Sequence, residues 1–164
     1  MSVAVSRPLR LLMVCTANIC RSPIAHGHAA SLGHEVRSGG TLGLEGRPAD
    51  PLSVRVMRER GVDISHHVSS GISEADMAWA DHVLVMEMRH RVQLAQRHPA
   101  HADKILLLGQ FGGKHEIADP LGGWRWRFRR CRDEIIRCVD GFLAAAPPPT
   151  QEPAPPQDPA PRKD

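Results

Sequence analysis

Short apolar segments alternate with polar ones along this chain, and four of them have the length and composition of buried strands. They cover residues 9–14, 35–38, 82–86 and 104–108. The first contains one charged residue, Arg10, and runs directly into Cys15, whereas the second is closed by Gly39 and Gly40. The pattern therefore predicts a sheet of four short strands.

Helix signals follow the first of these strands. Ser22 precedes Pro23, a pair that favours an N-cap followed by the first residue of a helix. Residues 24–32 continue the helical segment up to Gly33. We therefore predict a helix that is capped by Ser22 and ends at Gly33.

Similar signals predict three more helices. Asp50 and Pro51 repeat the cap and the proline, and the helix after them ends at Gly61. Residues 89–97 have a helical pattern, and a last helix is expected from apolar residues spaced three or four apart. Those residues are Phe128, Cys131, Ile135, Cys138, Val139 and Phe142. Strands and helices thus alternate, which predicts an α/β fold with a parallel sheet covered by helices on both faces.

The distribution of proline marks a boundary near residue 147. The chain has 164 residues and 14 prolines, and eight of these prolines lie in the last 18 residues. Proline lacks the N–H group that helices and sheets need. The sequence therefore predicts one domain over residues 1–146 and a Pro-rich, disordered tail over residues 147–164.

Charge and cysteine content exclude several classes of protein. The net charge of +3 is too small, without a basic patch, to indicate nucleic-acid binding. No apolar run reaches about 18 residues and the first residues lack the layout of a signal peptide, so no membrane insertion is expected. Four cysteines do not suggest the disulfide framework of a small secreted domain. The expected location is a reducing cytoplasm.

The segment between the first strand and the first helix carries the most informative chemistry. It reads CTANICRSP over residues 15–23. Backbone N–H groups of such a loop can converge on an anion beside the positive end of a helix, and the fork of Arg21 can grip two phosphate oxygens. The same field favours Cys15 as a thiolate, which attacks phosphorus, with Ser22 as a hydrogen-bond donor to the sulfur. The alternative is a buried cysteine followed by an ordinary helix start.

A second polar segment lies between the last strand and the last helix. Asp119 precedes Pro120, and two glycines follow at 122 and 123. Proline biases the residue before it toward an extended conformation, which can present the Asp119 carboxyl group to a pocket as a proton donor for a leaving oxygen. A simple Asp-Pro turn is the alternative. Because ligands bind at the carboxyl ends of parallel strands, Asp119 is expected beside the cysteine loop.

Taken together, these segments resemble the low-molecular-weight protein tyrosine phosphatases. The matching motifs are VCTANICRSPIA at 14–25, SGGT at 38–41, GRPADP at 46–51, GVDISHH at 61–67, ADHVLVMEMRH at 80–90, KILLLG at 104–109 and EIADP at 116–120. They follow the family's order and span about residues 8–143. The resemblance implies a four-stranded parallel sheet with helices on both faces and a phosphate-binding loop after the first strand.

The resemblance also implies a role for each matching residue. Cys15 would be the nucleophile, Arg21 the phosphate clamp, and Asp119 the general acid and then the general base. Cys20 matches a position where many members carry a second cysteine, able to form a reversible disulfide with Cys15; a small buried residue is the alternative. The loop further comprises Thr16, Ala17, Asn18 and Ile19, and bracing hydrogen bonds are expected from Asn18, Ser22, Ser38 and His67.

Three positions depart from the family pattern. Ala17 stands where the family usually has glycine, and a positive φ there would cost about 1 kcal/mol. Leu121 replaces the aromatic residue that usually follows the Asp-Pro pair, and Leu44 is expected on the opposite wall of the pocket. A phosphotyrosine ring would then lie between aliphatic walls, with less stacking than an aromatic pair gives.

The function implied by the resemblance is hydrolysis of phosphotyrosine in proteins through a phosphocysteine intermediate, without a metal or other cofactor. The motifs are most similar to bacterial members that act beside exopolysaccharide or capsule tyrosine kinases, so phosphotyrosine proteins, among them an autophosphorylated bacterial tyrosine kinase, are the expected partners. Two alternatives stay open: an arsenate reductase of the same fold, and a phosphate-binding module without turnover. The ten histidines lack the spacing of metal ligands.

Basic and aromatic residues alternate at residues 124–132, in the sequence WRWRFRRCR. The simpler interpretation is the start of the last helix, with Phe128 and Cys131 turned inward and the arginines in solvent. The other interpretation is a docking rim for acidic phosphopeptides, with Trp124 or Trp126 touching the substrate.

Overall fold

Four parallel strands form one sheet in the order β2-β1-β3-β4 in the computed structural model, which describes residues 7–146. The strands are β1 (Arg10–Cys15), β2 (Glu35–Gly40), β3 (His82–Val85) and β4 (Ile105–Leu107). The expected α/β class and four-stranded parallel sheet are confirmed. The predicted tail at 147–164 lies outside the described residues and stays a prediction.

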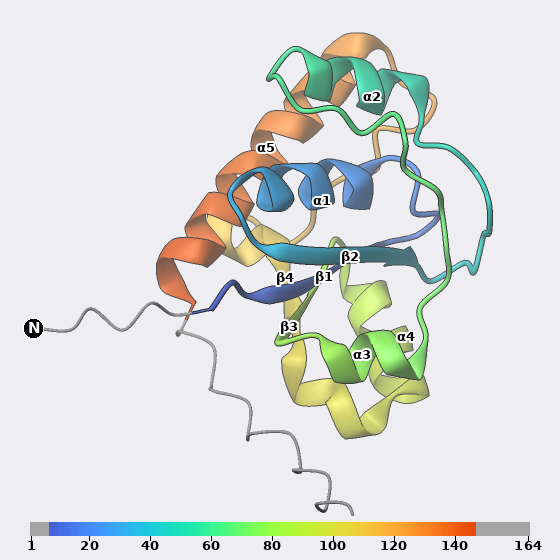
Figure 1. Cartoon of the computed structure of the whole chain (residues 1–164), viewed down its shortest axis with the longest axis vertical. Helices are drawn as coiled ribbons and strands as arrows, with labels where there is room; N and C mark the ends of the chain where they lie inside the picture. Colours follow the sequence, from blue (N-terminus) through green and yellow to red (C-terminus); the bar gives the residue numbers. More distant parts are fainter. Residues whose placement is uncertain (1–6, 147–164) are drawn as a thin grey trace, which may run out of the picture.

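Helices cover both faces of this sheet. They are α1 (Arg21–Ser31), α2 (Pro51–Arg58), α3 (Glu74–Trp79), α4 (Met88–Arg97) and α5 (Arg125–Ala145), with 3-10 turns η1 (Pro99–Lys104) and η2 (Leu108–Gly112). In Figure 1, α1, α2 and α5 lie above the sheet, and α3 and α4 lie below it. The short α3, which the sequence pattern did not predict, is capped by Ser73. None of the helices in residues 7–146 is long and apolar enough to cross a membrane.

The alternation of side chains along β1 divides the core into two layers. Leu11, Met13 and Cys15 belong to the layer formed with α1, α2 and α5. Leu12 and Val14 belong to the layer formed with α3 and α4. Because β1 is an inner strand with both faces covered, it reads as an almost continuous apolar run.

Helix α1 begins earlier than the Ser22-Pro23 signal predicted. Its first residue is Arg21, and no side chain caps its N-terminus. Ser22 lies inside the first turn, where its hydroxyl contacts Cys15 and Asn18. The prediction of a Ser22 cap was therefore wrong, because this hydroxyl is used by the loop instead of by the helix backbone.

Helix α2 follows its sequence signal. The Asp50 carboxylate accepts a hydrogen bond from Leu52 N at 2.8 Å, and Pro51 is the first helical residue. The helix ends at Arg58, just before the turn at Gly61, whose φ is 74°. A glycine can adopt this left-handed conformation without strain, so it ends the helix as expected.

Candidate active site

The loop between β1 and α1, residues 15–20, lies at the carboxyl edge of the sheet. Cys15, the last residue of β1, pairs with Gly40, the last residue of β2, and is only 2% exposed. A Cβ on Gly40 would lie 2.5 Å from the carbonyl oxygen of Thr16, closer than packed atoms can come. This glycine therefore allows the end of β2 to approach the backbone of the loop.

The backbone carbonyl groups and the backbone N–H groups of the loop differ in their hydrogen bonding. Five of its carbonyl oxygens accept hydrogen bonds from other segments. The pairs are Thr41 N to Cys15 O, Leu42 N to Thr16 O, His67 Nε2 to Asn18 O, Asp50 N to Ile19 O and Ser53 Oγ to Cys20 O, at 2.7–3.2 Å. By contrast, the backbone N–H groups of residues 16–20 donate to no acceptor within residues 7–146. Such a run of available N–H groups at a helix N-terminus forms a cradle for an anion.

Asn18 fixes the shape of this loop. Among residues 7–146 it alone has a positive φ without being glycine, and that φ is 59°. Its side-chain oxygen accepts a hydrogen bond from Ser70 N at 3.1 Å, and its amide nitrogen donates to Ser22 Oγ at 2.7 Å. Asparagine adopts the left-handed conformation more readily than most residues. The strain expected at Ala17 is absent, because the left-handed residue of the loop is the next one along.

Arg21 lies beneath the loop and is 1% exposed. Its Nη1 atom donates to Glu87 Oε1 at 2.5 Å and to the backbone oxygen of Ile117 at 2.8 Å. Its Nε atom is buried and has no hydrogen-bond partner among the described residues. Buried donors are nearly always satisfied in folded proteins, so this N–H points to an oxygen that a ligand supplies.

Glu87 follows β3 and holds the Arg21 guanidinium in place. Its second carboxylate oxygen accepts from Arg89 Nε at 2.7 Å. Burial opposes ionisation of Glu87, but the hydrogen bonds from Arg89 and Arg21 outweigh it and lower the pKa to about 2. Glu87 is therefore charged at neutral pH and offsets the charge of the buried guanidinium.

His90 connects this ion pair to the side chain of Thr16. The backbone N–H of Glu87 donates to His90 Nδ1 at 3.1 Å, which assigns the ring hydrogen to Nε2. That Nε2 lies 2.9 Å from Thr16 Oγ1, which also accepts from Arg89 Nη2 at 2.7 Å. Burial, assisted by the charge of Arg21, lowers the pKa of His90 to about 4, so the ring is neutral at physiological pH.

The predicted nucleophile, clamp and acid meet at one point. Ser22 Oγ lies 3.0 Å from Cys15 Sγ. Asp119 comes from the segment before α5, and its Oδ2 lies 3.6 Å from Arg21 Nη2. Its Oδ1 accepts from Leu121 N at 3.0 Å. The Asp-Pro pair thus forms a turn and also directs a carboxylate to the loop, so the two interpretations of this motif are compatible.

A small cavity opens over the loop. It is lined by Cys15, Ala17, Ile19, Cys20, Arg21, Asp119 and Leu121. Leu121 is 53% exposed and lies at its mouth. Leu44, expected on the opposite wall, is not among the lining residues, because its segment turns at Gly43 and Gly46, both with positive φ. Ile19 from the loop itself supplies aliphatic surface instead.

None of the four cysteines, Cys15, Cys20, Cys131 and Cys138, forms a disulfide in the structure, and all four are buried. Cys20 lines the cavity, and burial raises the pKa of its thiol far above the usual range. Cys131, on α5, is buried as well, and burial raises its pKa to about 12. Both thiols are therefore protonated at neutral pH. A disulfide between Cys15 and Cys20 stays a prediction.

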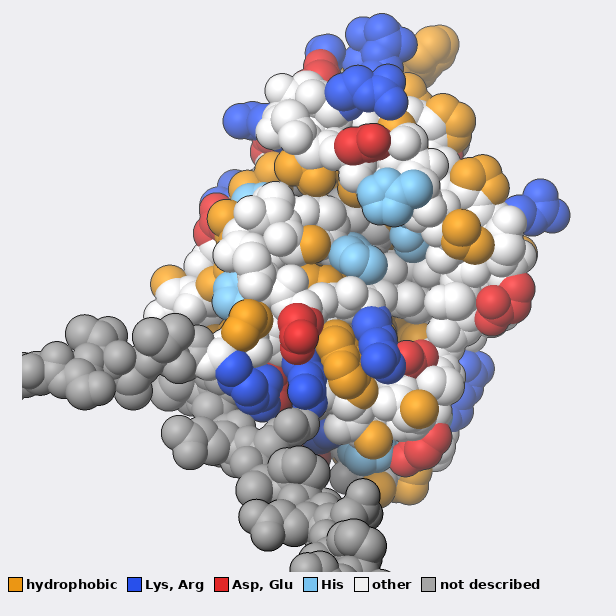
Figure 2. Space-filling view, viewed as in Figure 1, with side chains coloured by type: hydrophobic (Ala, Val, Ile, Leu, Met, Phe, Trp, Pro, Cys, Tyr) orange, Lys and Arg blue, Asp and Glu red, His pale blue; other side chains and the backbone are white. Residues whose placement is uncertain are grey.

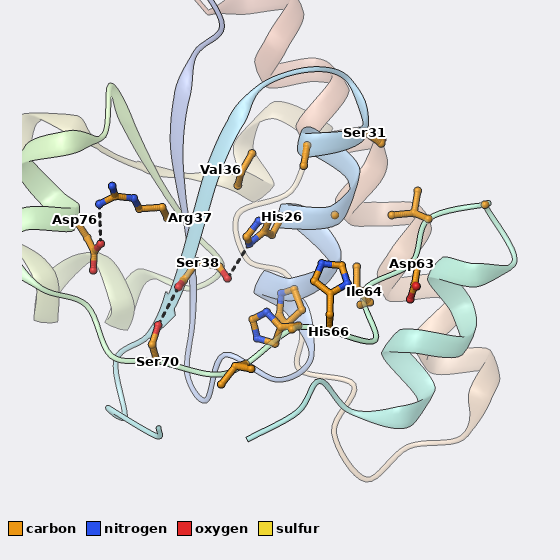
Figure 3. Close-up of a pocket in the computed structure, with 17 residues that line it drawn as sticks. His26, Ser31, Val36, Arg37, Ser38, Asp63, Ile64, His66, Ser70 and Asp76 are labelled. Carbon is orange, nitrogen blue, oxygen red and sulfur yellow. Dashed lines mark hydrogen bonds and ion pairs between the residues drawn. The ribbon is translucent and has the colours of Figure 1, made fainter. Parts of the chain in front are cut away.

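A larger cavity, of about 670 Å³, lies beside α1 and β2, where Figure 3 shows His26 directed at Ser38. His26 Nδ1 bonds Ser38 Oγ at 3.1 Å, and Ser70 Oγ donates to the backbone oxygen of Ser38 at 3.4 Å. Ser38 thus supports the loop through Ser70, whereas His67, on the same cavity wall, bonds Asn18 directly. No group of three or more potential metal ligands occurs here or elsewhere in residues 7–146.

Three residues of the site were not singled out in the sequence: Glu87, His90 and Ser70. A signal existed for Glu87 and His90, because they follow a predicted buried strand and so lie at the same sheet edge as Cys15. Ser70 follows no strand, and its backbone contact with the loop is decided by the path of the chain.

The fold and the site define a class of protein, in which a cysteine- and arginine-containing phosphate loop follows the first strand of a parallel α/β sheet. The family described as low molecular weight phosphotyrosine protein phosphatase matches residues 10–148. The chain belongs to this family of enzymes.

The proteins that are similar to this chain include some that are named arginine phosphatases and others that are named tyrosine phosphatases. The protein-arginine-phosphatase of Geobacillus stearothermophilus is 39% identical over 81% of this chain and 93% of that protein. The probable low molecular weight protein-tyrosine-phosphatase EpsP of Ralstonia nicotianae is 36% identical over 81% of this chain and 92% of that protein. The solved structure of Vibrio vulnificus Wzb in complex with benzylphosphonate is 30% identical, has a TM-score of 0.80, and matches over 84% of this chain and 99% of that one.

Proposed function

We propose that this enzyme hydrolyses phosphotyrosine in proteins through a phosphocysteine intermediate. The observation that carries the proposal is the set of donors around Cys15. The N–H groups of residues 16–20 and the buried Nε of Arg21 have no acceptor among the described residues, and Arg21 and three of these loop residues line the same cavity as the buried Cys15. A phosphoryl group placed there would receive hydrogen bonds on its oxygens while its phosphorus faces the sulfur.

In the first step, the Cys15 thiolate attacks phosphorus and the bond from phosphorus to the ester oxygen breaks. Asp119, in its protonated form, gives its proton to the departing phenol oxygen. Arg21 and the loop N–H groups stabilise the charge on the equatorial oxygens of the phosphoryl group. The products are a free tyrosine side chain and a phosphocysteine.

In the second step, the Asp119 carboxylate takes a proton from a water molecule, whose oxygen attacks the phosphorus. The S–P bond breaks, inorganic phosphate leaves, and the sulfur departs as a thiolate. Ser22, 3.0 Å from that sulfur, stabilises the leaving thiolate by a hydrogen bond. Asp119 is then protonated again for the next substrate.

The walls of the cavity favour an aryl phosphate. Ala17, Ile19 and Leu121 present aliphatic surface, which suits a flat apolar ring. Asp119 is the single carboxylate among the lining residues. The resemblance to tyrosine phosphatases extends the proposal to an autophosphorylated bacterial tyrosine kinase, in an exopolysaccharide pathway, as a physiological partner.

The mechanism is tested with an aryl phosphate and a phosphotyrosine peptide. Wild-type enzyme is expected to hydrolyse both, Cys15→Ser to abolish turnover, and Asp119→Asn to lower kcat about 10²- to 10⁴-fold. Cys138→Ser, a change of the same kind in a buried thiol of α5, serves as the control and should retain turnover. Activity that survives Cys15→Ser would overturn the mechanism. Thiol consumption that depends on arsenate would instead identify a reductase, and phosphate binding without turnover would identify a binding module.

Phosphoarginine is the second candidate substrate, because the Geobacillus stearothermophilus relative that is 39% identical is named a protein-arginine-phosphatase. A phosphoguanidinium is polar and hydrogen-bonds through several N–H groups, which the aliphatic cavity wall does not satisfy. We therefore expect a higher kcat/KM for a phosphotyrosine peptide than for a phosphoarginine peptide of the same sequence. The reverse order would reassign the substrate.

A further inference from the structure

A second cleft adjoins the phosphate cavity and shares Asp119 with it. Its volume is about 210 Å³, and it lies between the segment that carries Asp119, residues 114–120, and the first turns of α5. The lining residues are Lys114, Glu116, Ala118, Asp119, Pro120, Trp126, Arg127, Arg130, Cys131 and Glu134. Because Asp119 lines both hollows, a residue beside a phosphorylated side chain that enters the first can reach the second.

Some of the charged side chains that line this cleft have a partner in the structure, and others do not. Glu134 pairs with Lys114 at 3.5 Å, and Glu116 Oε1 accepts from the backbone N–H of Met88 at 3.0 Å. By contrast, within residues 7–146 no carboxylate forms an ion pair with Arg127 or Arg130. The same holds for Arg125, one residue into α5 and outside the cleft. Of the charged side chains that line the cleft, Arg127, Arg130 and Glu116 have no ion-pair partner among the described residues, so the unpaired charges sum to a single positive charge.

The start of α5 departs from what stabilises a helix. Its first turn contains no acidic residue and its N-cap, Trp124, makes no side-chain hydrogen bond. Arg125 and Arg127 instead add positive charge where the helix dipole is already positive, an unfavourable arrangement. Local rules of this kind are broken mainly at functional positions. Figure 2 shows basic side chains gathered at this end of the molecule, over α2 and the start of α5.

Arg127 packs against the turn that follows Asp119 and Pro120. A Cβ on Gly123 would lie 2.7 Å from Arg127 Cδ, so the arginine stem crosses the turn at the glycine. Trp126 lines the cleft and is 59% exposed, and Trp124 is 79% exposed. Exposed tryptophan beside arginine is the composition of a protein-recognition surface.

We propose that this cleft binds acidic residues that flank the phosphotyrosine of a protein substrate, with Arg127 and Arg130 as the charged contacts and Trp126 as the apolar one. The inference rests on the proposed function and specifies its substrate class. The cleft lies outside the phosphate cavity, so it acts on peptide substrates and leaves a small aryl phosphate unaffected.

The test compares two phosphotyrosine peptides of equal length, one with Asp and Glu around the tyrosine and one with Asn and Gln. Wild-type kcat/KM is expected to be about tenfold higher for the acidic peptide at low salt, and added NaCl should reduce this advantage. The double variant R127Q/R130Q should abolish the preference while keeping kcat/KM for a small aryl phosphate within about twofold. Arg137→Gln removes one positive charge from the same helix, about 10–15 Å further along, and should leave the preference unchanged, whereas each single variant, R127Q and R130Q, should reduce it.

The outcomes separate the inference from the proposed function. Equal kcat/KM for both peptides in the wild type would overturn the docking inference alone. So would a loss in R127Q/R130Q that extends equally to the aryl phosphate, or an equal loss of preference in Arg137→Gln. Failure of the wild type to hydrolyse either tyrosine peptide would overturn the proposed function as well.

Discussion

The hydroxyl oxygen of Ser22 lies 3.0 Å from the sulfur of Cys15. The Asn18 amide donates to the same hydroxyl at 2.7 Å, and the side-chain oxygen of Asn18 is engaged by Ser70 N, which fixes the orientation of the amide. Because one lone pair of Ser22 is taken by this donor, the hydroxyl hydrogen is free to point at the sulfur. The fixed orientation of the Asn18 side chain thus leaves the Ser22 hydroxyl available to donate a hydrogen bond to the Cys15 sulfur.

Replacement of Ser22 by alanine is expected to lower kcat about 10- to 100-fold, since a hydrogen bond to a charged group contributes about 1.5–3 kcal/mol. The slowed step should be breakdown of the phosphocysteine, because the leaving thiolate loses a hydrogen-bond donor. Ser31→Ala, in the exposed last turn of α1, is the control. An unchanged kcat together with an unchanged rate of phosphocysteine breakdown would show that Ser22 is not a donor to the sulfur.

The substitution Glu87→Gln should make the free energy of unfolding depend less on pH. The carboxyl pKa in the folded protein is about 2, below its ordinary value of 4.5, so Glu87 contributes stability that is fully present above about pH 4.5. This contribution is lost as the pH falls toward 2. Urea unfolding should therefore show a larger difference between wild type and Glu87→Gln at pH 7 than at pH 3.

The control for this experiment is Glu35→Gln, at a surface carboxylate that is 57% exposed and pairs with Arg10. Exposed pairs contribute little, so a small difference is expected at either pH. A stability difference for Glu87→Gln that stays constant between pH 7 and pH 3 would contradict the linkage.

Gly40→Ala should disturb the loop without touching its side chains. The added Cβ would lie 2.5 Å from Thr16 O and 2.9 Å from the carbonyl carbon of Ala17, both backbone atoms that cannot move aside easily. We expect a loss of about 1–3 kcal/mol in the free energy of unfolding, together with weaker binding of inorganic phosphate. Gly71→Ala, whose Cβ would meet its nearest atom at 3.4 Å, is the matched control. Equal losses of stability and of phosphate binding in the two variants would show that the close approach of β2 to the loop does not determine the shape of the loop.

Ala17→Gly should bring no gain, although the family usually has glycine there. Ala17 is not among the residues with a positive φ, so glycine relieves no strain. It adds freedom to the unfolded chain, and we expect a loss of about 0.4–1 kcal/mol in the free energy of unfolding, with kcat unchanged. A more stable or faster Ala17→Gly enzyme would mean that the alanine distorts the loop.

The elements of the fold were largely predictable because they depend on local patterns. Apolar runs located all four strands, and the Asp50-Pro51 pair located the start of α2. The same kind of signal was wrong at Ser22, because a hydroxyl near a helix start can also serve a neighbouring sulfur. Sequence alone does not choose between these partners.

The site was predictable only where its residues follow one another or end a strand. Cys15 and Arg21 belong to one loop, and Asp119 follows the last strand at the same edge of the sheet. Glu87 contacts Arg21 across 66 positions of sequence, and Ser70 contacts Asn18 across 52. Such pairs obey no spacing rule, since the packing of separate segments creates them.

By itself, the sequence predicted which groups perform phosphoryl chemistry and determined that they stand after strands of a parallel sheet, since strand periodicity and loop composition are local properties. The tertiary structure decided how these groups are directed. It assigned the left-handed conformation to Asn18 instead of Ala17, engaged the loop carbonyls while leaving the loop N–H groups without an acceptor among the described residues, and left Arg127 and Arg130 without an ion-pair partner in the cleft that Asp119 lines. These features depend on contacts between distant segments, and such contacts form only when the chain is folded.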